Sequence, residues 1–492
     1  MAISVKKKDE VYLKVNTDLS TDQELNDFFT FDVPGAKFMP LYRNRMWDGK
    51  ARLYSLYKKE LYVGLLPYLK EFAETLEYDL DIDIPEIGET CDVKELTDNL
   101  KLHAGGSPIQ ARDYQIEAVN HCINEGRTLL LSPTASGKSL IIYTLLRYHQ
   151  ARGRKQLIIV PTTSLVEQMY GDFSDYSTAD KHWATPDNCH RIYGGKEKSN
   201  EFPVTISTWQ SIYKYPKQWF SQFDVVYGDE AHLFKAKSLT TLMNKLTNTP
   251  YRIGTTGTLD GTKTHRLVLE GVFGQVHKVT TTKKLMDTKQ LANLKIICCT
   301  LNYKDVIRKE MKGKNYQEEI DWLVTNPDRN EIIKNLTIAQ EGNTLVLFQF
   351  VEKHGTVLHE MISKGVKKGR KVFFVYGGTE TEQREQVRAI TEKENDVIII
   401  ASYGTFSTGI NIRNLHNIVF ASPSKSRIRN LQSIGRGLRR GDKKVVCNLF
   451  DIGDDLSWKS HKNYTLNHLI ERVKLYNEEG FDYKLVKIDV RS

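Results

Sequence analysis

The chain has 492 residues and a formal net charge of +9, made up of 70 basic and 61 acidic side chains. Its content of 40% hydrophobic and 27% charged residues is ordinary for a folded protein and excludes wholesale disorder. One hydrophobic core rarely serves a chain of this length, so we expect about two to four domains.

The cysteines and the first residues of the chain indicate an intracellular protein. No two of the six cysteines have the C-x-x-C spacing of a zinc or redox site. The opening sequence MAISVKKKDE lacks the apolar segment of a signal peptide, and no apolar run has the length of a membrane span. We therefore expect a reduced, cytoplasmic protein that has no membrane partner.

Residues 1–100 lack the pattern of the later chain, and we expect a separate small α+β domain there. Within it, residues 42–60 mix basic with aromatic side chains. Basic groups neutralise phosphates and aromatic rings stack on bases, so the mixture favours nucleic acid. It is equally typical of a small β-rich domain with an aromatic core, and both interpretations can hold together. The candidate nucleic-acid residues are Arg43, Arg45, Trp47, Lys50 and Arg52.

The sequence LLLSPTASGKSLIIYTLL has the form of a phosphate loop: a buried strand, a tight turn, Gly-Lys-Ser and a helix. Backbone N–H groups wrap the phosphates, Lys138 adds a positive charge, and the Ser139 hydroxyl can bind Mg²⁺. Ala135 stands where a second glycine is common, and a left-handed backbone there would be strained. The loop predicts ATP and Mg²⁺ as cofactors, bound by Pro133, Thr134, Ala135, Ser136, Gly137, Lys138 and Ser139.

Short apolar runs alternate with amphipathic segments from Leu129 to about Asp260, which predicts βαβ units and a parallel sheet. One of these runs, FDVVYGDEAH, ends in two carboxylates at the edge where such a fold binds its ligand. We expect Asp229 to hold Mg²⁺ together with Ser139, and Glu230 to orient or deprotonate the attacking water.

The same alternation recurs between Asn343 and Asp451, which predicts a second α/β domain of similar plan. The charged segment between the two patterns has helical periodicity, and it either contacts nucleic acid or braces the domains. The expected parts are an accessory nucleic-acid-binding domain (1–100), an ATP-binding domain (101–260), a connecting or inserted helical segment (261–330), the second α/β domain (331–455) and a helical tail (456–492).

The sequence QSIGRGLRR, from Gln432 to Arg440, predicts a basic helix in the second α/β domain. Arg436 and Arg439 are three residues apart, so they lie on one helical face. An arginine supplied by a second domain can meet the charge of the transition state and make hydrolysis depend on domain closure. From the residues alone, this face can equally be a solvated surface or a surface that contacts nucleic acid.

Taken together, these elements resemble the motif series of superfamily two helicases over roughly residues 110–452, and most closely the XPB and RecG-like branch. The resemblance implies two tandem RecA-like domains and a nucleic-acid-stimulated ATPase. It places Arg112, Tyr114 and Gln115 at the adenine and assigns Gln432, Arg436 and Arg439 to ATP hydrolysis. It also implies strand contacts by Thr162, Gln168, Thr208, Gln210, Ser211 and Thr408, a nucleotide contact at Gly409, and coupling through Thr256 and Thr258.

The same resemblance implies action on branched or duplex DNA, and on RNA–DNA hybrids, in recombination, replication and repair. It implies a monomer, with single-strand-binding or recombination proteins as further partners. Gly257 and Asn411 depart from the residues usual in two of the motifs. The alternatives are a duplex translocase without strand separation, a phosphate-loop ATPase acting on a metabolite or protein, and an annealing module with a vestigial ATPase.

Overall fold

The computed structural model describes residues 2–194, 201–235, 237–409, 412, 414–424, 426–438 and 446–491. Side chains at positions 235, 381, 407–409, 427, 428 and 436 are not described. The chain forms two compact units: residues 1–132 with 137–280, and residues 281–492 with the short segment 133–136. Within the described ranges, no helix is both long and apolar enough to cross a membrane.

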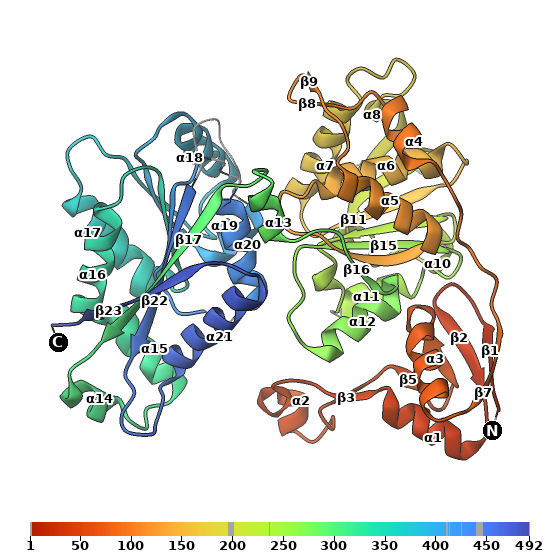
Figure 1. The fold of residues 1–492 in the computed structure, drawn as a ribbon, viewed down its shortest axis with the longest axis horizontal. Coiled ribbons are helices and arrows are strands. Elements are labelled where there is room, and N and C mark those ends of the chain that lie inside the picture. Colours follow the sequence, from red (N-terminus) through yellow and green to blue (C-terminus); the bar gives the residue numbers. More distant parts are fainter. Residues whose placement is uncertain are drawn as a thin grey trace. The chain divides into compact units, whose positions relative to one another are not determined.

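The first unit begins with a small α+β domain (Figure 1). Its five-stranded sheet has the order β5-β6-β2-β1-β7, in which β1 and β7 are parallel and the other pairs are antiparallel. Apolar side chains from the sheet and from the helices α1 and α3 form its core. The elements are β1 Ala2–Lys7, β2 Tyr12–Asn16, α1 Leu19–Phe28, β5 Tyr54–Ser55, β6 Glu60–Tyr62, α3 Leu66–Thr75 and β7 Asp79–Asp83.

An arm extends from this small domain, between α1 and β5 (Figure 1). It consists of β3 Thr30–Asp32, the 3-10 turn η1 Ala36–Phe38, the helix α2 Pro40–Arg43 and β4 Lys50–Arg52. β3 and β4 pair antiparallel and form its base. We call residues 30–52 the arm.

Partly buried polar contacts attach the small domain to the rest of the first unit. Glu10 pairs with Arg127 at 2.9 Å, and the Tyr68 hydroxyl donates to Glu270 at 2.6 Å. Glu89, in the segment that follows β7, accepts hydrogen bonds from the hydroxyls of Tyr148 and Tyr251. Because groups on both sides of each contact would be left unpaired by separation, the small domain is fixed on the domain that follows it.

A seven-stranded parallel sheet forms the rest of the first unit, in the order β12-β13-β11-β14-β15-β10-β16. Its strands are β10 Arg127–Leu131, β11 Gln156–Val160, β12 Cys189–Ile192, β13 Val204–Thr208, β14 Val225–Asp229, β15 Tyr251–Thr256 and β16 Val276–Lys278. The helices are α4 Val93–Asn99, α5 Asp113–Glu125, α6 Lys138–Gln150, α7 Thr163–Tyr176, α8 Thr185–Asn188, α9 Trp209–Ile212, α10 Lys217–Phe220, α11 Lys237–Met243 and α12 Lys263–Phe273, with a hairpin of β8 His103–Ala104 and β9 Ser107–Pro108.

The second unit contains another seven-stranded parallel sheet, in the order β19-β20-β18-β21-β22-β17-β23. Its strands are β17 Asn293–Asn302, β18 Thr344–Phe348, β19 Val372–Val375, β20 Ile398–Ser402, β21 Asn417–Phe420, β22 Val446–Asp455 and β23 Tyr483–Asp489. The helices are α13 Thr282–Asp287, α14 Asp305–Met311, α15 Tyr316–Thr325, α16 Pro327–Ile338, the π-helix η4 Val351–Thr356, α17 Val357–Gly365, α18 Thr381–Lys393, α19 Tyr403–Gly409, α20 Arg427–Gly437 and α21 Tyr464–Glu478. The predicted plan, two parallel-sheet domains preceded by a small α+β domain, is confirmed.

The segments between and after the two sheets differ from the sequence interpretation. Residues 261–330 are not a helical insert: α12 and β16 belong to the first sheet domain, whereas β17 is a ten-residue strand of the second. The tail after residue 456 holds a helix, as expected, but also β23, which pairs with β17. Parallel pairing joins strands that are far apart in the chain, so local periodicity did not reveal it.

Two buried arginines hold the second unit together. Arg472 of α21 pairs with Asp451 of β22 at 2.8 Å, and Arg329 of α16 pairs with Asp454 at 2.8 Å. The Tyr476 hydroxyl also donates to Asp451. Removing one partner of such a pair leaves a buried charge, at a cost of about 3–5 kcal/mol. These pairs therefore attach α16 and α21 firmly to the sheet.

Candidate active site and nucleic-acid surface

The phosphate loop lies between β10 and α6. Lys138 is the first residue of α6, and its Nζ donates to the carbonyl of Ser132 at 3.2 Å. Ala135 has a φ of +65°, so the left-handed backbone considered from the sequence is present at a residue that carries a Cβ. Such a conformation costs about 1–3 kcal/mol and is typical of functional loops.

Gly137 brings the predicted adenine motif against the phosphate loop. Its φ is +83°, and a Cβ at this position would come within 2.3 Å of the Gln115 amide nitrogen. Gln115 is buried at the start of α5, where its side-chain oxygen accepts from the Arg112 amide at 2.9 Å. The Arg112 guanidinium in turn donates to the Tyr114 hydroxyl at 2.7 Å. The structure thus brings together two motifs that the sequence places more than twenty residues apart.

The two acidic residues lie at the carboxyl end of β14: Asp229 is its last residue and Glu230 follows it. Asp229 is buried and accepts a hydrogen bond from the Thr255 hydroxyl at 2.8 Å. Burial and the neighbouring Glu230 raise the pKa of Asp229, and attraction to Lys138 opposes this rise. Lys138 and Asp229 are therefore close enough to interact electrostatically, as a nucleotide site requires.

Glu230 also has an uncommon backbone conformation, with a φ of +50°. Its carboxylate lies 3.3 Å from Nδ1 of His232, and that nitrogen lies 3.1 Å from the Thr256 hydroxyl. The Thr256 hydroxyl donates to the Thr258 carbonyl at 2.9 Å. His232 thus connects the acidic pair to the two threonines predicted to couple ATP state to strand binding.

His232 and Thr255 were not among the residues singled out from the sequence. His232 is part of the DEAH sequence itself, but the sequence did not indicate that it contacts Thr256. Thr255 lies opposite Asp229 on the adjacent parallel strand β15. Only the register of that pairing reveals its contact.

The predicted strand-binding residues lie at the carboxyl ends of β11 and β13. These strands are paired in parallel, and Val160 lies opposite Thr208. Thr162 is the N-cap of α7, and the Gln210 amide donates to the Pro161 carbonyl at 3.3 Å. The Thr208 and Ser211 hydroxyls are 2.8 Å apart. Gln168, on α7, is exposed. The structure therefore brings the two motifs to one edge of the sheet.

The site residues predicted in the second unit are described only in part. Gln432 lies on α20 and is half-buried. Thr408, Gly409 and Arg436 lie on described helices, but their side chains are outside the described set. Arg439 and Asn411 lie outside the described residues altogether. Their roles remain predictions.

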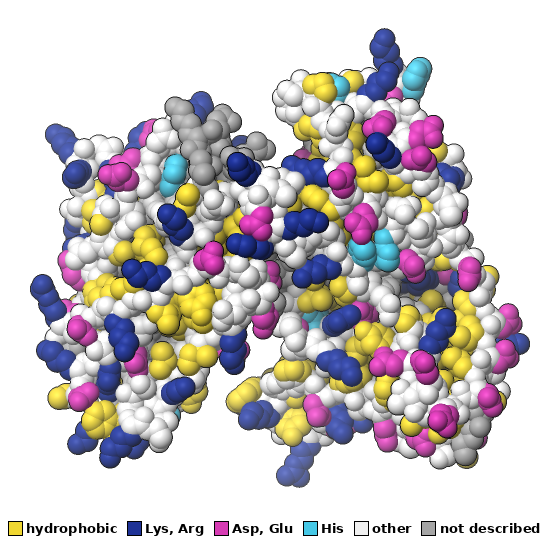
Figure 2. Space-filling view, viewed as in Figure 1, with side chains coloured by type: hydrophobic (Ala, Val, Ile, Leu, Met, Phe, Trp, Pro, Cys, Tyr) yellow, Lys and Arg dark blue, Asp and Glu magenta, His cyan; other side chains and the backbone are white. Residues whose placement is uncertain are grey.

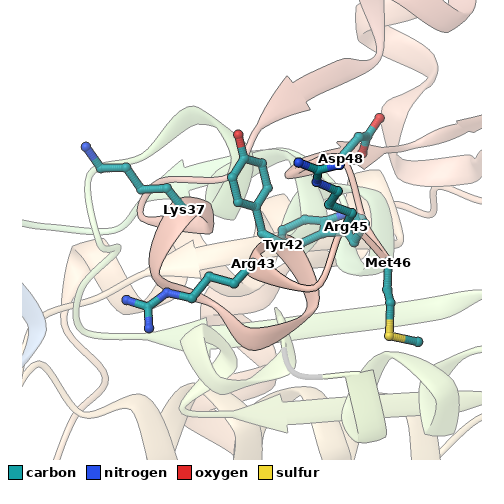
Figure 3. A pocket seen from close by; sticks show the side chains of 7 residues that line it. Lys37, Tyr42, Arg43, Arg45, Met46 and Asp48 are labelled. Atoms are coloured by element: carbon teal, nitrogen blue, oxygen red, sulfur yellow. The ribbon is translucent and has the colours of Figure 1, made fainter.

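The arm carries the basic residues predicted to bind nucleic acid (Figure 2). A hollow of about 630 Å³ lies at its tip, lined by Lys37, Tyr42, Arg43, Arg45, Met46, Trp47 and Asp48 (Figure 3). Arg43 and Arg45 are exposed, and no ion pair engages either of them in the described part of the chain. Arg52 differs, because it pairs with Asp48 at 2.5 Å.

The aromatic residues of this region divide between the two interpretations. Tyr54 is buried and its hydroxyl donates to Asp22 at 2.6 Å, so it belongs to the domain core. Tyr57 is 96% exposed, and Phe38 and Met46 on the arm are 66% and 74% exposed. Trp47 is half-buried, and its indole N–H donates to the Lys50 carbonyl at 2.8 Å. The arm thus presents apolar and cationic groups together.

Comparison with known proteins places this arrangement in a family. The family described as "DNA helicase UvsW, N-terminal" matches residues 2–83, "Type III restriction enzyme, res subunit" matches residues 108–261, and "Helicase conserved C-terminal domain" matches residues 328–441. The ATP-dependent DNA helicase uvsW of Enterobacteria phage T4 is 36% identical over the whole of both chains. This chain belongs to the UvsW family of ATP-dependent DNA helicases.

The fold supports the same assignment. The crystal structure of T4 UvsW matches with a TM-score of 0.53 at 35% identity, over 99% of this chain and 100% of that one. The DNA 3'-5' translocase XPB2 of Sulfurisphaera tokodaii is 22% identical over 69% of this chain and 80% of that protein. The resemblance to superfamily two helicases that the motifs suggested is therefore confirmed, and UvsW is a relative over the full length.

The UvsW family match also bears on the accessory domain. The matched segment ends at residue 83, the last residue of the edge strand β7, and does not extend to residue 100. The helix α4 that follows packs against α5 and α6 of the parallel-sheet domain.

Proposed function

We propose that this chain is an ATP-driven DNA helicase that unwinds or branch-migrates branched DNA, such as R-loops, forks and Holliday junctions, in recombination, replication and repair. The observation that carries the proposal is the docking of the small domain on the ATP-binding sheet. The Glu10–Arg127 and Tyr68–Glu270 contacts fix the exposed basic arm to the domain that holds Lys138 and the acidic pair. A motor so built can hold duplex DNA while its sheet edge acts on a strand.

ATP use follows from family membership, and the donor set fits Mg²⁺. Mg²⁺ prefers oxygen ligands. Ser139 provides a hydroxyl oxygen and Asp229 provides a carboxylate. The raised pKa of Asp229 shows that its ionised form is disfavoured by burial and by Glu230. A bound cation would offset both effects. Ser139 and Asp229 would hold Mg²⁺, which would neutralise charge on the outer phosphates.

The remaining residues would act as follows. Lys138 places a positive charge at the terminal phosphates, and Glu230 orients or deprotonates the attacking water. The assignment of Arg436 and Arg439 to the charge of the transition state rests on the family motif. His232 would transmit changes at Glu230 to Thr256, because it contacts both. Thr162, Gln168, Thr208, Gln210 and Ser211 would hold the DNA strand. We place this activity in the cytoplasm of the phage host.

The proposed substrate class is tested on three DNAs of matched sequence. Wild-type protein is incubated with ATP and a labelled four-way junction, a fork or a plain duplex at one salt concentration. We expect ATP-dependent dissociation of the junction and the fork. ATP hydrolysis stimulated by the plain duplex, without dissociation of either branched DNA, would instead support a duplex translocase.

The arm is tested in the same assay with the variant Arg43→Ala/Arg45→Ala. Each exposed arginine that contacts a phosphate contributes about 0.9 to the slope of log affinity against log salt. We therefore expect weaker junction binding and a slope shallower by about two, with ATP hydrolysis at saturating DNA retained.

A control with the same loss of charge is Lys94→Ala/Lys101→Ala. Both lysines are exposed, on α4 and the turn after it, at the other end of the first unit from the arm (Figure 1). The control should keep the wild-type salt slope. Equal slopes for the arm variant and the wild type would remove the arm from the DNA-binding surface.

A further inference from the structure

Ser139, the proposed Mg²⁺ ligand, has a partner that the nucleotide motifs do not include. Its Oγ lies 2.8 Å from the Tyr176 hydroxyl. Ser139 is the second residue of α6, and Tyr176 is the last residue of α7. The two helices pack side by side on the sheet, so the contact joins the start of one to the end of the other.

The Tyr176 side chain is held in place by aromatic neighbours. Its ring centroid is 5.5 Å from that of Tyr143, and Tyr143 also packs against Phe173 and Trp183. The phenol oxygen of Tyr176 is within hydrogen-bond distance of the Ser139 hydroxyl, and it can accept a hydrogen bond from that hydroxyl.

This geometry suits the chemistry of a hydroxyl that binds a cation. A serine hydroxyl has one proton and two lone pairs. When a lone pair faces Mg²⁺, the proton must point to another acceptor, and the Tyr176 oxygen occupies such a position. Without it, the Ser139 hydroxyl is free to rotate, and its correct orientation has to be selected during binding.

The opposite end of α7 lies at the predicted DNA strand site. Thr162 caps this end of the helix, and the helix has 14 residues, which corresponds to a length of about 21 Å. One continuous helix thus has a proposed strand contact at its start and the Ser139 contact at its end. A displacement of α7 caused by DNA would move the acceptor of the Ser139 proton.

We propose that Tyr176 is a positioning residue that orients the Ser139 hydroxyl toward Mg²⁺ and, through α7, makes that orientation depend on bound DNA. The inference rests on the proposed role of Ser139. It requires only contacts within the first unit.

The test measures the affinity of a fluorescent, non-hydrolysable ATP analogue, with saturating Mg²⁺ and with EDTA. In the wild type we expect Mg²⁺ to tighten binding, and single-stranded DNA to change the size of this Mg²⁺ effect. In Tyr176→Phe, which removes only the hydroxyl, the Mg²⁺ effect should fall about fivefold, the value of one ordinary hydrogen bond. Its affinity in EDTA should match the wild type.

Tyr143→Phe is the matched control. It also removes a buried tyrosine hydroxyl, which contacts Arg147 and not Ser139, so its Mg²⁺ effect should match the wild type. The double variant Ser139→Ala/Tyr176→Phe should show the same Mg²⁺ effect as Ser139→Ala alone, because Tyr176 acts through Ser139. The comparison of these two variants shows whether Tyr176 acts through Ser139 even if Tyr176→Phe lowers stability.

The outcomes separate the inference from the function it rests on. An unchanged Mg²⁺ effect in Tyr176→Phe would overturn the positioning role while leaving Ser139 as the ligand. A reduced Mg²⁺ effect with an unchanged response to DNA would overturn the link through α7. If Mg²⁺ did not affect nucleotide binding by the wild type, the Mg²⁺ site itself would be wrong, and this inference with it.

Discussion

Lys138→Ala should abolish steady-state ATP hydrolysis. Lys138 opens α6 with its ammonium group directed back over the phosphate loop, where it donates to the Ser132 carbonyl. A positively charged or hydrogen-bonding group that stabilises the charge developing in the transition state typically raises turnover by about 10²–10³-fold. Lys138 also lowers the pKa of Asp229. Its removal should therefore destabilise the ionised form of that carboxylate as well.

The measurement is the turnover number with saturating DNA, together with DNA affinity in the absence of nucleotide. We expect turnover to fall by at least about 100-fold while DNA affinity changes little, because Lys138 belongs to the phosphate loop and not to the strand motifs. Lys94→Ala removes the same charge from an exposed position and should retain both values. Undiminished turnover in Lys138→Ala would refute the nucleotide site.

Glu230→Gln should stop turnover without preventing nucleotide binding. The substitution preserves shape but removes the carboxylate that is expected to orient or deprotonate water. General-base catalysis contributes about 10²–10⁴, so we expect kcat to fall by that factor and KM to change little.

The contrast between kcat and KM identifies the role of Glu230. Glu95→Gln, at an exposed position in the first turn of α4, is the matched control and should behave like the wild type. A defect confined to KM would mean that Glu230 binds nucleotide and takes no part in hydrolysis. His232→Ala should not reproduce the full loss, since His232 contacts Glu230 and would affect hydrolysis only through it.

Much of the candidate site could be predicted because its signals are local. The phosphate loop, the acidic pair and the threonine motifs are each contiguous in sequence and lie at the end of a buried strand. In a parallel sheet, the carboxyl ends of the strands lie at one edge, so the motifs were expected to converge. The sequence also marked Ala135 as a position where a left-handed backbone would be strained, and the structure has such a backbone there.

The contacts of Tyr176 and His232 could not be predicted in this way. Tyr176 is 37 residues from Ser139, and no motif spans that interval. Its role depends on how α7 packs beside α6, which sequence periodicity does not specify. The strands β17 and β23 were missed for a related reason, since they pair with each other across more than 180 residues. Whether an aromatic residue belongs to the core, as Tyr54 does, or is exposed, as Tyr57 is, also depends on tertiary packing.

The most direct test of the proposed function is ATP hydrolysis by the purified chain at one fixed salt concentration. Rates are compared without nucleic acid and with single strands, plain duplex, forks and four-way junctions. We expect strong stimulation by DNA, greatest with the branched forms. Equal hydrolysis with and without nucleic acid would contradict a DNA-driven motor and favour an ATPase that acts on a metabolite or protein.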